Sequence, residues 1–580
     1  MDRLKHTTIL LVSLVVQQFC IAQNIVSLNK INELDRQINE TTFISTNKTT
    51  FISGETILFK VYCLNKTNFS NSGLSKIVYI ELVNSDKESL VKQKIFMKDG
   101  IGFGDFFIPG NLKTGAYKLI AYTNWMLNFK NDYSQSDITI INPYQTNSKY
   151  INNTVENKKD SIFSKNNFIN NADESNIEIN KQNFTNREEV KLKINFKNNN
   201  LKKGNYNISV YKKDNLDSNN APFFQKDKII SEEKAINQKS IEELSLPEIR
   251  GEIIQGRIIP KNSNATLENK NVSLSIPGKS FAFKITKTNN KGQFSFILDN
   301  VYQNPNISVQ LIDEDANDYR LEILPQKKFD YSQIHFQSSI QLNESLKEAI
   351  EKRSIASQIE NAYFSVKQDS IIPSSQPGPF YGFFSKEYLL DNFTRFRTLK
   401  ETILEIVPKM FVKQSNNKYG IYLDDYNQGD ELPVPTLVLV DGLYIEDIDE
   451  LFEYNPKNIE KINVIYGGYE YGTKFFNGVV FFTTKNNDYE SKSKYDFLIK
   501  PEILRPVLNK KYYSPIYKDS VLLKHIPDFR NQLLWLTEVN NTDAEVSFYT
   551  SDISGIFEIV LQGFSSDGEP VSLKKTFEVN

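Results

Sequence analysis

The sequence predicts a mainly β protein, with several β-sandwiches in a row and one α+β domain. Short runs in which apolar and polar residues alternate recur along the chain, and Gly, Asn and Asp turns separate them, as in antiparallel sandwiches. The 40 Phe and 29 Tyr residues supply apolar surface for several cores. A chain of 580 residues is too long for one core, so we expect roughly three to five domains. Only residues 388–487 interleave strands with helices.

Residues 1–22 have the pattern of an export signal. Basic residues precede an apolar run that ends in Cys20-Ile21-Ala22, and we expect cleavage before Gln23. The bulky Phe19 argues against lipidation at Cys20. Core burial rather than a disulfide must stabilise the mature chain, because Cys63 is then its one cysteine. No later apolar run reaches about 18 residues, so no membrane-spanning helix is expected. These features indicate a protein of the cell envelope, in the periplasm or associated with the outer membrane.

Residues 23–144 are expected to form the first sandwich. Their segments read SGETILFKVYC, KIVYIELVN, MKDGIGFGDFFIP and KTGAYKLIAYTNWM. This order of strands and turns resembles the macroglobulin-type (MG2) domain of exported bacterial proteins. We interpret Cys63 as a small buried apolar residue and Trp125 as a core or domain-seam aromatic. An Asn- and Lys-rich linker is predicted at 145–173, and a second sandwich at 174–232.

Residues 248–330 predict a third sandwich. A strand, a polar loop, a second strand and the hairpin NKGQFSF follow one another. This arrangement resembles the carboxypeptidase regulatory-like (transthyretin-type) domain. Gly292 permits the positive φ of the hairpin turn, and Phe294 and Phe296 are expected to point into the same core.

Residues 388–487 carry the most specific pattern. A helix containing TLKETILEIVP precedes TLVLVDGLYIEDIDELFEYNPKNIEKINVIYGGYEYGTKFFNGVVFFTTK, in which a buried strand, an acidic helix, a second strand, a Gly-rich turn and a third strand follow in order. That order resembles the plug domain of TonB-dependent outer-membrane receptors. The residues that carry this motif are predicted to be structural and to contribute to a docking site; they are Asp441, Gly442, Asn455, Pro456, Ile459, Gly467, Gly472, Asn477 and Gly478.

Two segments flank this domain. Residues 340–366 predict an amphipathic helix with Asn343 as its N-cap, which we expect to pack on or connect to the plug-like domain. Residues 495–580 are predicted to form a C-terminal immunoglobulin-like sandwich. Their sequence resembles the end of a family of exported Bacteroidota proteins that combine these modules; the matching segments read FRNQLLWL and EVSFYTSDISGIFEIVLQGFSSDGEP. About 95 residues follow Lys485, so we expect a plug-like domain without a β-barrel.

The sequence predicts no catalytic, cofactor or metal site. Catalytic zinc needs about three protein ligands, and neither His335 nor His525 has a Glu at ligand spacing. The motifs of serine hydrolases are missing. Carboxylates at Asp424-Asp425 and within 447–450 leave a glycosidase or calcium site as an alternative, but a solvated turn and an acidic helix face are favoured. A formal charge of −2 gives no basic face, so nucleic-acid binding is not expected.

The leading functional hypothesis is therefore a non-enzymatic exported scaffold. Tandem sandwiches offer sheet edges to partners, and the plug-like domain is the candidate docking piece for an outer-membrane protein complex or a TonB-type component. A surface glycan- or ligand-binding protein of nutrient uptake is the alternative, with Tyr466, Tyr469 and Tyr471 as a stacking platform. An undetected hydrolase is the third hypothesis.

Overall fold

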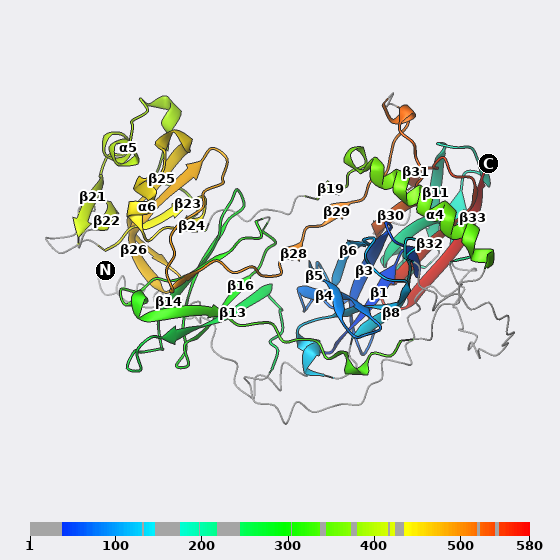
Figure 1. Ribbon diagram of the computed structural model, residues 1–580, viewed down its shortest axis with the longest axis horizontal. Coiled ribbons are helices and arrows are strands. Elements are labelled where there is room, and N and C mark those ends of the chain that lie inside the picture. The colour runs from blue at the N-terminus through cyan, green and yellow to red at the C-terminus, as the bar shows by residue number, and fades with distance from the viewer. Residues whose placement is uncertain are drawn as a thin grey trace, which may run out of the picture. The chain divides into compact units, whose positions relative to one another are not determined.

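The computed structural model describes residues 38–129, 133–145, 175–196, 198–216, 244–302, 304–336, 344–372, 380–415, 418–423, 434–518, 522–539 and 545–580. These fall into two compact units (Figure 1). Unit 1 comprises Glu252–Gln326 and Ser374–Arg505, and unit 2 comprises Leu28–Gly251, Lys327–Pro373 and Pro506–Asn580, within the described ranges. The predicted export signal and most of the predicted linker at 145–173 lie outside the described residues. None of the helices described is both long and apolar enough to cross a bilayer.

Unit 2 begins with a sandwich that we call sandwich A. One sheet has the order β1 (Glu40–Thr46), β3 (Thr56–Asn65), β6 (Ile101–Phe107). The other has the order β2 (Thr50–Ile52), β8 (Ser134–Ile141), β7 (Gly115–Tyr122), β4 (Ile77–Asn84), β5 (Ser89–Phe96), β28 (Pro506–Val507). Cys63 lies in the core between the sheets, as predicted, and is fully buried. Trp125 opens the 3-10 helix η1 (Trp125–Asn128) and is also buried.

Sandwich B of unit 2 joins two segments that are far apart in the sequence. Its larger sheet has the order β10 (Asn183–Phe184), β33 (Pro570–Val579), β32 (Gly555–Phe564), β12 (Asn205–Lys212), β30 (Gln532–Val539). Its smaller sheet has the order β31 (Glu545–Tyr549), β11 (Glu189–Phe196), β9 (Ser175–Ile179), and the short helix α3 (Asn199–Lys202) precedes β12.

The prediction of two separate sandwiches at 174–232 and 495–580 is therefore wrong. Strand β12 lies between β32 and β30, with Ser209 opposite Val560 and Trp535, so each segment supplies part of one core. Alternation identifies strands but not their partners, and for that reason the sequence did not reveal this pairing. The first part of 495–580 lies elsewhere, because β27 (Leu498–Ile499) belongs to unit 1, and β29 (Lys510–Lys511) pairs with β19 (Ser370–Ile371).

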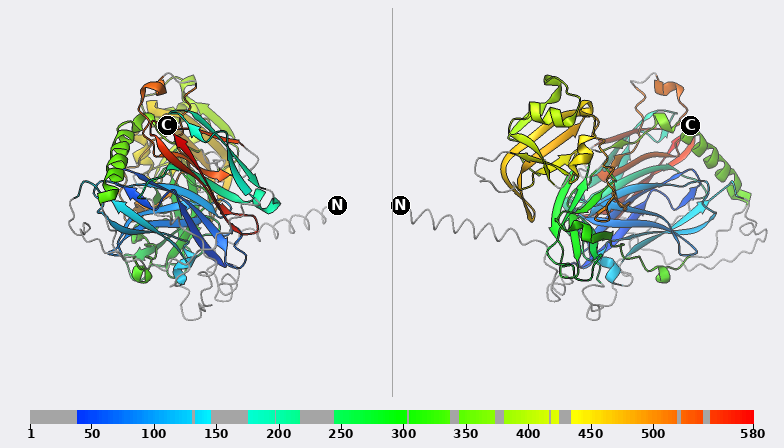
Figure 2. Two further views of the ribbon diagram at one scale, coloured as in Figure 1. Left: turned by 90° about the vertical axis from the view of Figure 1, so that its right-hand side faces the viewer. Right: turned by 60° about the vertical axis from the view of Figure 1, so that its left-hand side comes forward.

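The predicted amphipathic helix is α4 (Glu344–Ala362), and the expectation that it packs on the plug-like domain is wrong. It lies in unit 2 (Figures 1 and 2), whereas the α+β domain belongs to unit 1. Leu346, Ala349 and Ile350 pack on a cluster that contains Ile52 and Ile141 of sandwich A and also Leu216. Polar contacts add to this packing, since Arg353 donates to Glu55 at 2.6 Å and to the carbonyl oxygen of Thr50 at 2.9 Å. Its predicted cap, Asn343, lies outside the described residues. The 3-10 helices η6 (Tyr331–Gln333), η7 (Phe364–Val366) and η10 (Leu522–His525) also belong to unit 2.

Unit 1 contains a further sandwich, sandwich C. Its sheets have the orders β16 (Gln293–Leu298), β13 (Glu252–Pro260), β18 (Tyr319–Ile323) and β15 (Ala282–Lys287), β14 (Asn271–Ile276), β17 (Ser308–Leu311), β27. The 3-10 helix η5 (Ala316–Asp318) precedes β18. Gly292 has φ +72°, and Phe294 and Phe296 are both buried in the core, which confirms the prediction for this hairpin.

The second part of unit 1 is an α+β module, which we define as residues 386–489. Its mixed sheet has the order β20 (Lys386–Leu389), β25 (Ile459–Tyr471), β26 (Lys474–Thr484), β23 (Leu437–Val440), β24 (Leu443–Tyr444), with β23 parallel to β26. A separate hairpin is formed by β21 (Met410–Ser415) and β22 (Lys418–Leu423). The helices are α5 (Leu399–Ile406), α6 (Ile448–Phe452), η8 (Leu390–Asn392) and η9 (Pro456–Asn458). Thr398 and Glu401 close a capping box at the start of α5.

The α+β module has a core on one face of its sheet. Val438, Val440, Val480 and Phe482 project from the central strands toward Ile403 of α5 and its neighbours. The opposite face carries Leu437, Leu439 and Phe481, which pack on Phe283 of sandwich C. Because both faces of β23 are covered, this strand reads as the continuous apolar run Leu437–Val440.

Candidate functional site

The nine motif residues all lie in the α+β module, and we begin with the Asp441-Gly442 turn. Both residues have positive φ, +50° and +89°. Asp441 is 1% exposed, and its carboxylate accepts hydrogen bonds from Thr484 N (2.8 Å), Thr484 Oγ1 (2.6 Å) and Tyr489 N (3.2 Å). Burial raises the pKa of this carboxyl, although these bonds oppose the rise. A Cβ at Gly442 would clash with Phe281 of sandwich C. This turn therefore fixes the seam between the module and sandwich C.

The Asn455-Pro456 pair begins η9, which leads directly into β25. The Asn455 side chain caps η9 by accepting from Lys457 N at 3.0 Å, and Pro456 occupies the first turn, where its missing N–H leaves no bond unmade. Ile459, the first residue of β25, is fully buried in the module core.

The remaining motif residues shape the long hairpin of β25 and β26. Gly467 has φ +89° at a register shift between Ile465 and Gly468. Gly472 (φ +62°) lies at the hairpin tip, and a Cβ there would approach Ile285 O to 3.0 Å. Asn477 donates from Nδ2 to Leu423 O at 3.0 Å, which ties the β21–β22 hairpin to the sheet, and a Cβ at Gly478 (φ +78°) would clash with Ile465 O. These contacts are internal to unit 1, so the motif residues shape the surface of the module from within.

The tyrosines considered as a stacking platform also make internal contacts. Tyr471 stacks on Phe283 at 5.6 Å between ring centroids and donates its hydroxyl to Phe283 O at 2.5 Å. Tyr469 packs in the same aromatic cluster between the module and sandwich C. The Tyr466 hydroxyl donates to Pro408 O at 2.7 Å. The rings hold parts of unit 1 together, and this packing does not favour the glycan-platform alternative.

The acidic residues at the start of α6 are partly buried and accept hydrogen bonds from neighbouring segments. The hydroxyl of Tyr495 donates to Asp447 at 2.5 Å, and Tyr419 N donates to Asp449 at 3.1 Å. Glu450 accepts hydrogen bonds from Ser491 and from the two residues that follow it. Within the residues that the structure describes, no group of three or more His, Cys, Asp or Glu side chains could hold a metal ion. Asp424 and Asp425 lie outside those residues.

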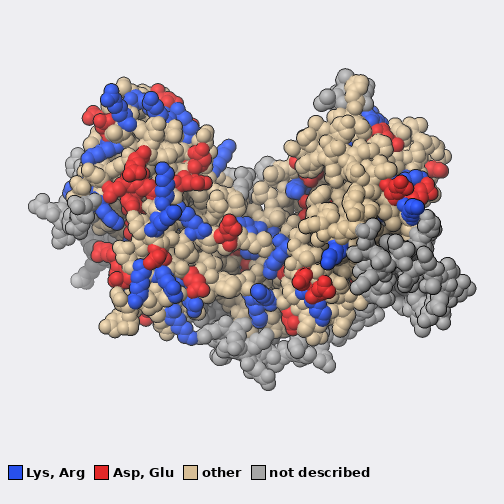
Figure 3. Space-filling model, viewed as in Figure 1, with Lys and Arg blue, Asp and Glu red and all other residues tan. Residues whose placement is uncertain are grey.

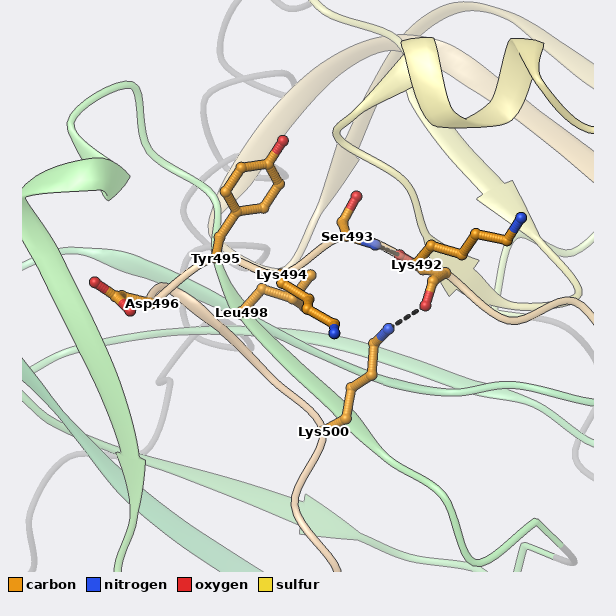
Figure 4. A pocket seen from close by; sticks show the side chains of 8 residues that line it. Lys492, Ser493, Lys494, Tyr495, Asp496, Leu498 and Lys500 are labelled. Carbon is orange, nitrogen blue, oxygen red and sulfur yellow. Dashed lines mark hydrogen bonds between the residues drawn. The ribbon is translucent and has the colours of Figure 1, made fainter.

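A hollow of about 700 Å³ opens beside the segment 491–500 (Figure 4). It is lined by Ser491, Lys492, Ser493, Lys494, Tyr495, Asp496, Leu498 and Lys500. Lys500 donates to Ser491 O, and Asp496 pairs with Lys261 at 2.8 Å. The hydrogen bond to Asp447 raises the pKa of Tyr495 to about 12. The lining contains no acid–base pair or nucleophile in a catalytic arrangement, and His335 and His525 are both exposed residues of unit 2.

One feature of the module that sequence reasoning missed is the edge of its sheet. On one side, β24 is covered, because Tyr444 N donates to Ser275 Oγ of sandwich C at 3.1 Å. On the other side, β20 pairs with β25, and none of the described strands pairs with its outer edge. Lys386, Glu387 and Leu389 are exposed there, with Leu389 42% exposed, while Tyr388 points into the core. The one sequence signal for this strand is the short segment KEYLL, whose apolar half starts at Tyr388.

The side chains along this edge carry both positive and negative charges. Lys461 and Asn463 of β25 both donate to Glu387, at 3.0 and 2.9 Å. On the face shown in Figure 3, basic and acidic side chains are interspersed over unit 1. Recognition at β20 would therefore depend on backbone hydrogen bonds and apolar contact more than on charge steering.

Comparisons with known proteins give little beyond this. No protein-family model and no curated protein matches the chain. Solved structures that align with 93% of the chain are bacterial alpha-2-macroglobulins. One is the Salmonella protein reacted with methylamine, at 8% identity, with 23% of that chain covered and a TM-score of 0.16. Another is the Escherichia coli protein activated by porcine elastase, at 9% identity, with 44% of that chain covered and a TM-score of 0.23. A third is the trypsin-activated Escherichia coli protein, at 9% identity, with 41% of that chain covered and a TM-score of 0.22. The chain spans less than half the length of each. With TM-scores this low, the description of the fold rests on the strand pairing given above.

Proposed function

We propose that the chain is a non-enzymatic, exported scaffold of the outer-membrane envelope, and that its α+β module binds an outer-membrane protein by strand addition at β20. The observation that supports this proposal most strongly is that, among the residues the structure describes, no strand pairs with the outer edge of β20. An exposed edge strand presents unpaired N–H and C=O groups, and a partner strand in extended conformation satisfies them.

The surroundings of β20 favour this edge over other parts of the module. One face of the sheet is covered by α5 and α6, the opposite face packs on sandwich C, and β24 is covered at the far edge. Exposed apolar side chains flank the open strand, with Leu389 at 42% and Phe393 at 43% exposure. An incoming strand would cover them while it pairs with the backbone of β20.

The plug-like motif directs the proposal to the outer membrane. The resemblance of residues 388–487 to receptor plug domains indicates a module suited to barrel proteins or TonB-type components, and the internal role of the motif residues leaves the sheet edge as the contact surface. Such a fold-level analogy supplies the class of partner, and the edge supplies the geometry.

Photo-crosslinking from intact envelopes tests the proposal. A photoreactive amino acid replaces Lys386 or Leu389 in turn, and the same substitution at Asn290, an exposed turn residue of sandwich C, is the control. We expect an outer-membrane protein to crosslink from the two β20 positions but not from Asn290. With the probe at position 389, Lys386→Pro removes a backbone donor at the first residue of an edge strand, where proline is tolerated, and should abolish the crosslink. Equal crosslinking from Asn290, or none from β20, would refute strand addition.

A further inference from the structure

The hollow at segment 491–500 lies where sandwich C and the α+β module of unit 1 are joined, and both parts hold this segment. On the module side, Glu450 of α6 accepts a hydrogen bond from Ser491 Oγ at 2.9 Å. On the other side, Leu311 N of sandwich C donates to Phe497 O at 3.0 Å, and β27 pairs with β17. The wall of the hollow is therefore held from two sides, and its volume of about 700 Å³ lies in the range of small-ligand sites.

Lys494 and Lys500 bring positive charge into this hollow. Figure 4 shows the ammonium ends of these two side chains directed toward each other, whereas the end of Lys492 is directed away from them. Lys500 donates to Ser491 O, and among the described residues no carboxylate forms an ion pair with any of the three lysines. An ammonium group has three N–H donors, so both lysines keep donors for a ligand. Two like charges directed at one space repel each other unless an anion lies between them.

The carboxylates that border the hollow are bound to other groups. Asp496 pairs with Lys261 at 2.8 Å. Asp447 accepts from the Tyr495 hydroxyl at 2.5 Å. Glu450 accepts only from hydroxyls and backbone amides of the segment. These contacts hold the segment in place and leave the two facing ammonium groups without a counter-ion among the described residues.

An aromatic ring forms another part of the wall. Tyr495 stacks on Phe497 with ring centroids 4.9 Å apart and 9° between the ring planes. Because its hydroxyl is bound to Asp447, Tyr495 offers a ligand its ring rather than a free hydroxyl. Lys418 of β22 lies 5.8 Å from the centroid of this ring and adds a cation beside it. A molecule in the hollow would therefore meet ammonium groups and an apolar aromatic surface.

We propose that this hollow binds a phosphate monoester, with the phosphate held between Lys494 and Lys500. A phosphate monoester carries close to two negative charges above its second pKa of about 6, so one group neutralises both ammonium ions. A carboxylate supplies a single charge and would leave one ammonium unpaired. The aromatic wall and the size of the hollow fit a phosphate carried on a sugar or on a lipid headgroup better than inorganic phosphate. Such a ligand site goes beyond strand addition at β20 and does not depend on it.

Isothermal titration calorimetry of the full chain tests the proposal with two phosphate carriers. The carriers are glucose 1-phosphate and phosphatidylcholine vesicles that contain phosphatidic acid, and their neutral counterparts are glucose and vesicles of phosphatidylcholine alone. We expect saturable binding of at least one carrier and none of its neutral counterpart, and the carrier that binds identifies the source of the phosphate. Inorganic phosphate should bind more weakly, because it makes no contact with the aromatic wall. Binding of neither carrier, equal binding of the neutral counterpart, or inorganic phosphate binding as tightly as both carriers would overturn the proposal.

Three lysine variants with the same change of charge locate the site. Lys494→Met and Lys500→Met should each weaken binding of the carrier at least about tenfold, because each removes a charged hydrogen-bond donor. Lys492→Met lies in the same segment but is directed away from the other two, so it is the matched control and should weaken binding less than about twofold. An equal loss in Lys492→Met would indicate general attraction to basic side chains and would overturn the proposal.

Two measurements on the unsubstituted chain do not depend on the folding of any variant. The affinity for the carrier should fall several-fold between about pH 7.5 and about pH 5, because the monoester loses its second charge while the lysines stay protonated. Hydrogen exchange in segment 491–500 should slow when the carrier is saturating, while exchange in sandwich B of unit 2 stays the same. An affinity that is unchanged or higher at acidic pH, or exchange in segment 491–500 that does not slow, would contradict the proposal.

Discussion

Phe283→Ala should separate the α+β module from sandwich C. Phe283 lies on β15, is 2% exposed and packs in the aromatic cluster between the two parts of unit 1. Its ring centroid lies 5.6 Å from those of Phe380 and Tyr471 and 5.8 Å from that of Tyr444. Truncation removes all three ring contacts and leaves a cavity, whereas the hydrogen bond from the Tyr471 hydroxyl to the Phe283 carbonyl oxygen does not need the side chain.

The magnitude follows from these contacts. Burying and then deleting a Phe ring in a core costs about 3–5 kcal/mol, which includes the cavity left behind. Each aromatic pair contributes about 0.5–1.5 kcal/mol beyond its buried area. Phe283 makes three aromatic contacts, so its truncation should cost more than the lower end of the range of about 3–5 kcal/mol. We expect the unfolding free energy of unit 1 to fall by about 4 kcal/mol.

Hydrogen exchange with mass spectrometry measures the loss. Peptides from β23 and β26 of the module and from β14 of sandwich C should both lose protection, because the seam joins them. Phe393→Ala, in the same unit but 43% exposed, is the control and should change protection by less than about 0.5 kcal/mol. If Phe283→Ala costs less than about 1 kcal/mol, or if only β14 loses protection, the module and sandwich C do not form one cooperative unit.

Further predictions concern turns and the helix of unit 2. Gly442→Ala should destabilise the module by more than about 2 kcal/mol, because the positive φ of Gly442 combines with a clash at Phe281. Gly467→Ala should cost about 1 kcal/mol, because no other atom lies within 4 Å of the added Cβ. The denaturant midpoints of the two variants give the comparison. Arg353→Met should raise hydrogen exchange in α4 while the strands of sandwich A change little. Burial raises the pKa of Glu55, but the ion pair with Arg353 more than offsets this, and the pKa lies below its ordinary value of 4.5. The ion pair therefore stabilises the position of α4 above pH 4.5, and this stabilisation is lost as the pH falls below that value. We expect α4 of the unsubstituted chain to detach on acidification.

Local pattern allowed much of the fold to be predicted. The run Leu437–Val440 indicated a buried strand, and the structure places one of its faces on the module core and the other on sandwich C. Phe294 and Phe296 lie on one side of a hairpin whose turn requires the positive φ of Gly292. These features depend on neighbours within a few residues, so the sequence contains them directly.

Features that depend on distant partners could not be predicted in this way. Lys60 follows an alternation that predicts an outward polar residue, and it does point away from the core of sandwich A, but sandwich B covers it. Ser209 pairs with Val560, about 350 positions along the chain, and period two is the same for any partner. The apolar residues of α4 predict a packed helix but not its partner, which is a cluster containing Ile52 and Ile141, with an ion pair from Arg353 to Glu55.

The candidate site also has parts that depend on local sequence and a part that depends on distant strands. The sequence pattern indicated a turn at Asp441-Gly442 and a chain break at Asn455-Pro456, and the structure has positive φ at the first pair and a cap at Asn455, because positive φ and capping are local requirements. The expected Gly-rich turn after Tyr466 is shorter than predicted, since β25 continues through Gly467 to Tyr471 and β26 begins at Lys474, before Asn477. The sequence pattern did not identify the edge at β20, because an edge exists only once the order of strands in the sheet is known. The contact surface we propose therefore lies beside the motif that drew attention to the module.

Quantitative affinity purification from intact envelopes tests the central claim most directly. The tagged full chain and its Lys386→Pro variant are purified in parallel from solubilised envelopes, with hydrogen exchange confirming that β25 and β26 remain protected in both. The account predicts that an outer-membrane barrel or TonB-type protein co-purifies with the unsubstituted chain and that its recovery falls at least about tenfold with the variant, since a blocked edge removes backbone hydrogen bonds. Equal recovery with both chains, or the absence of any outer-membrane protein, would contradict it.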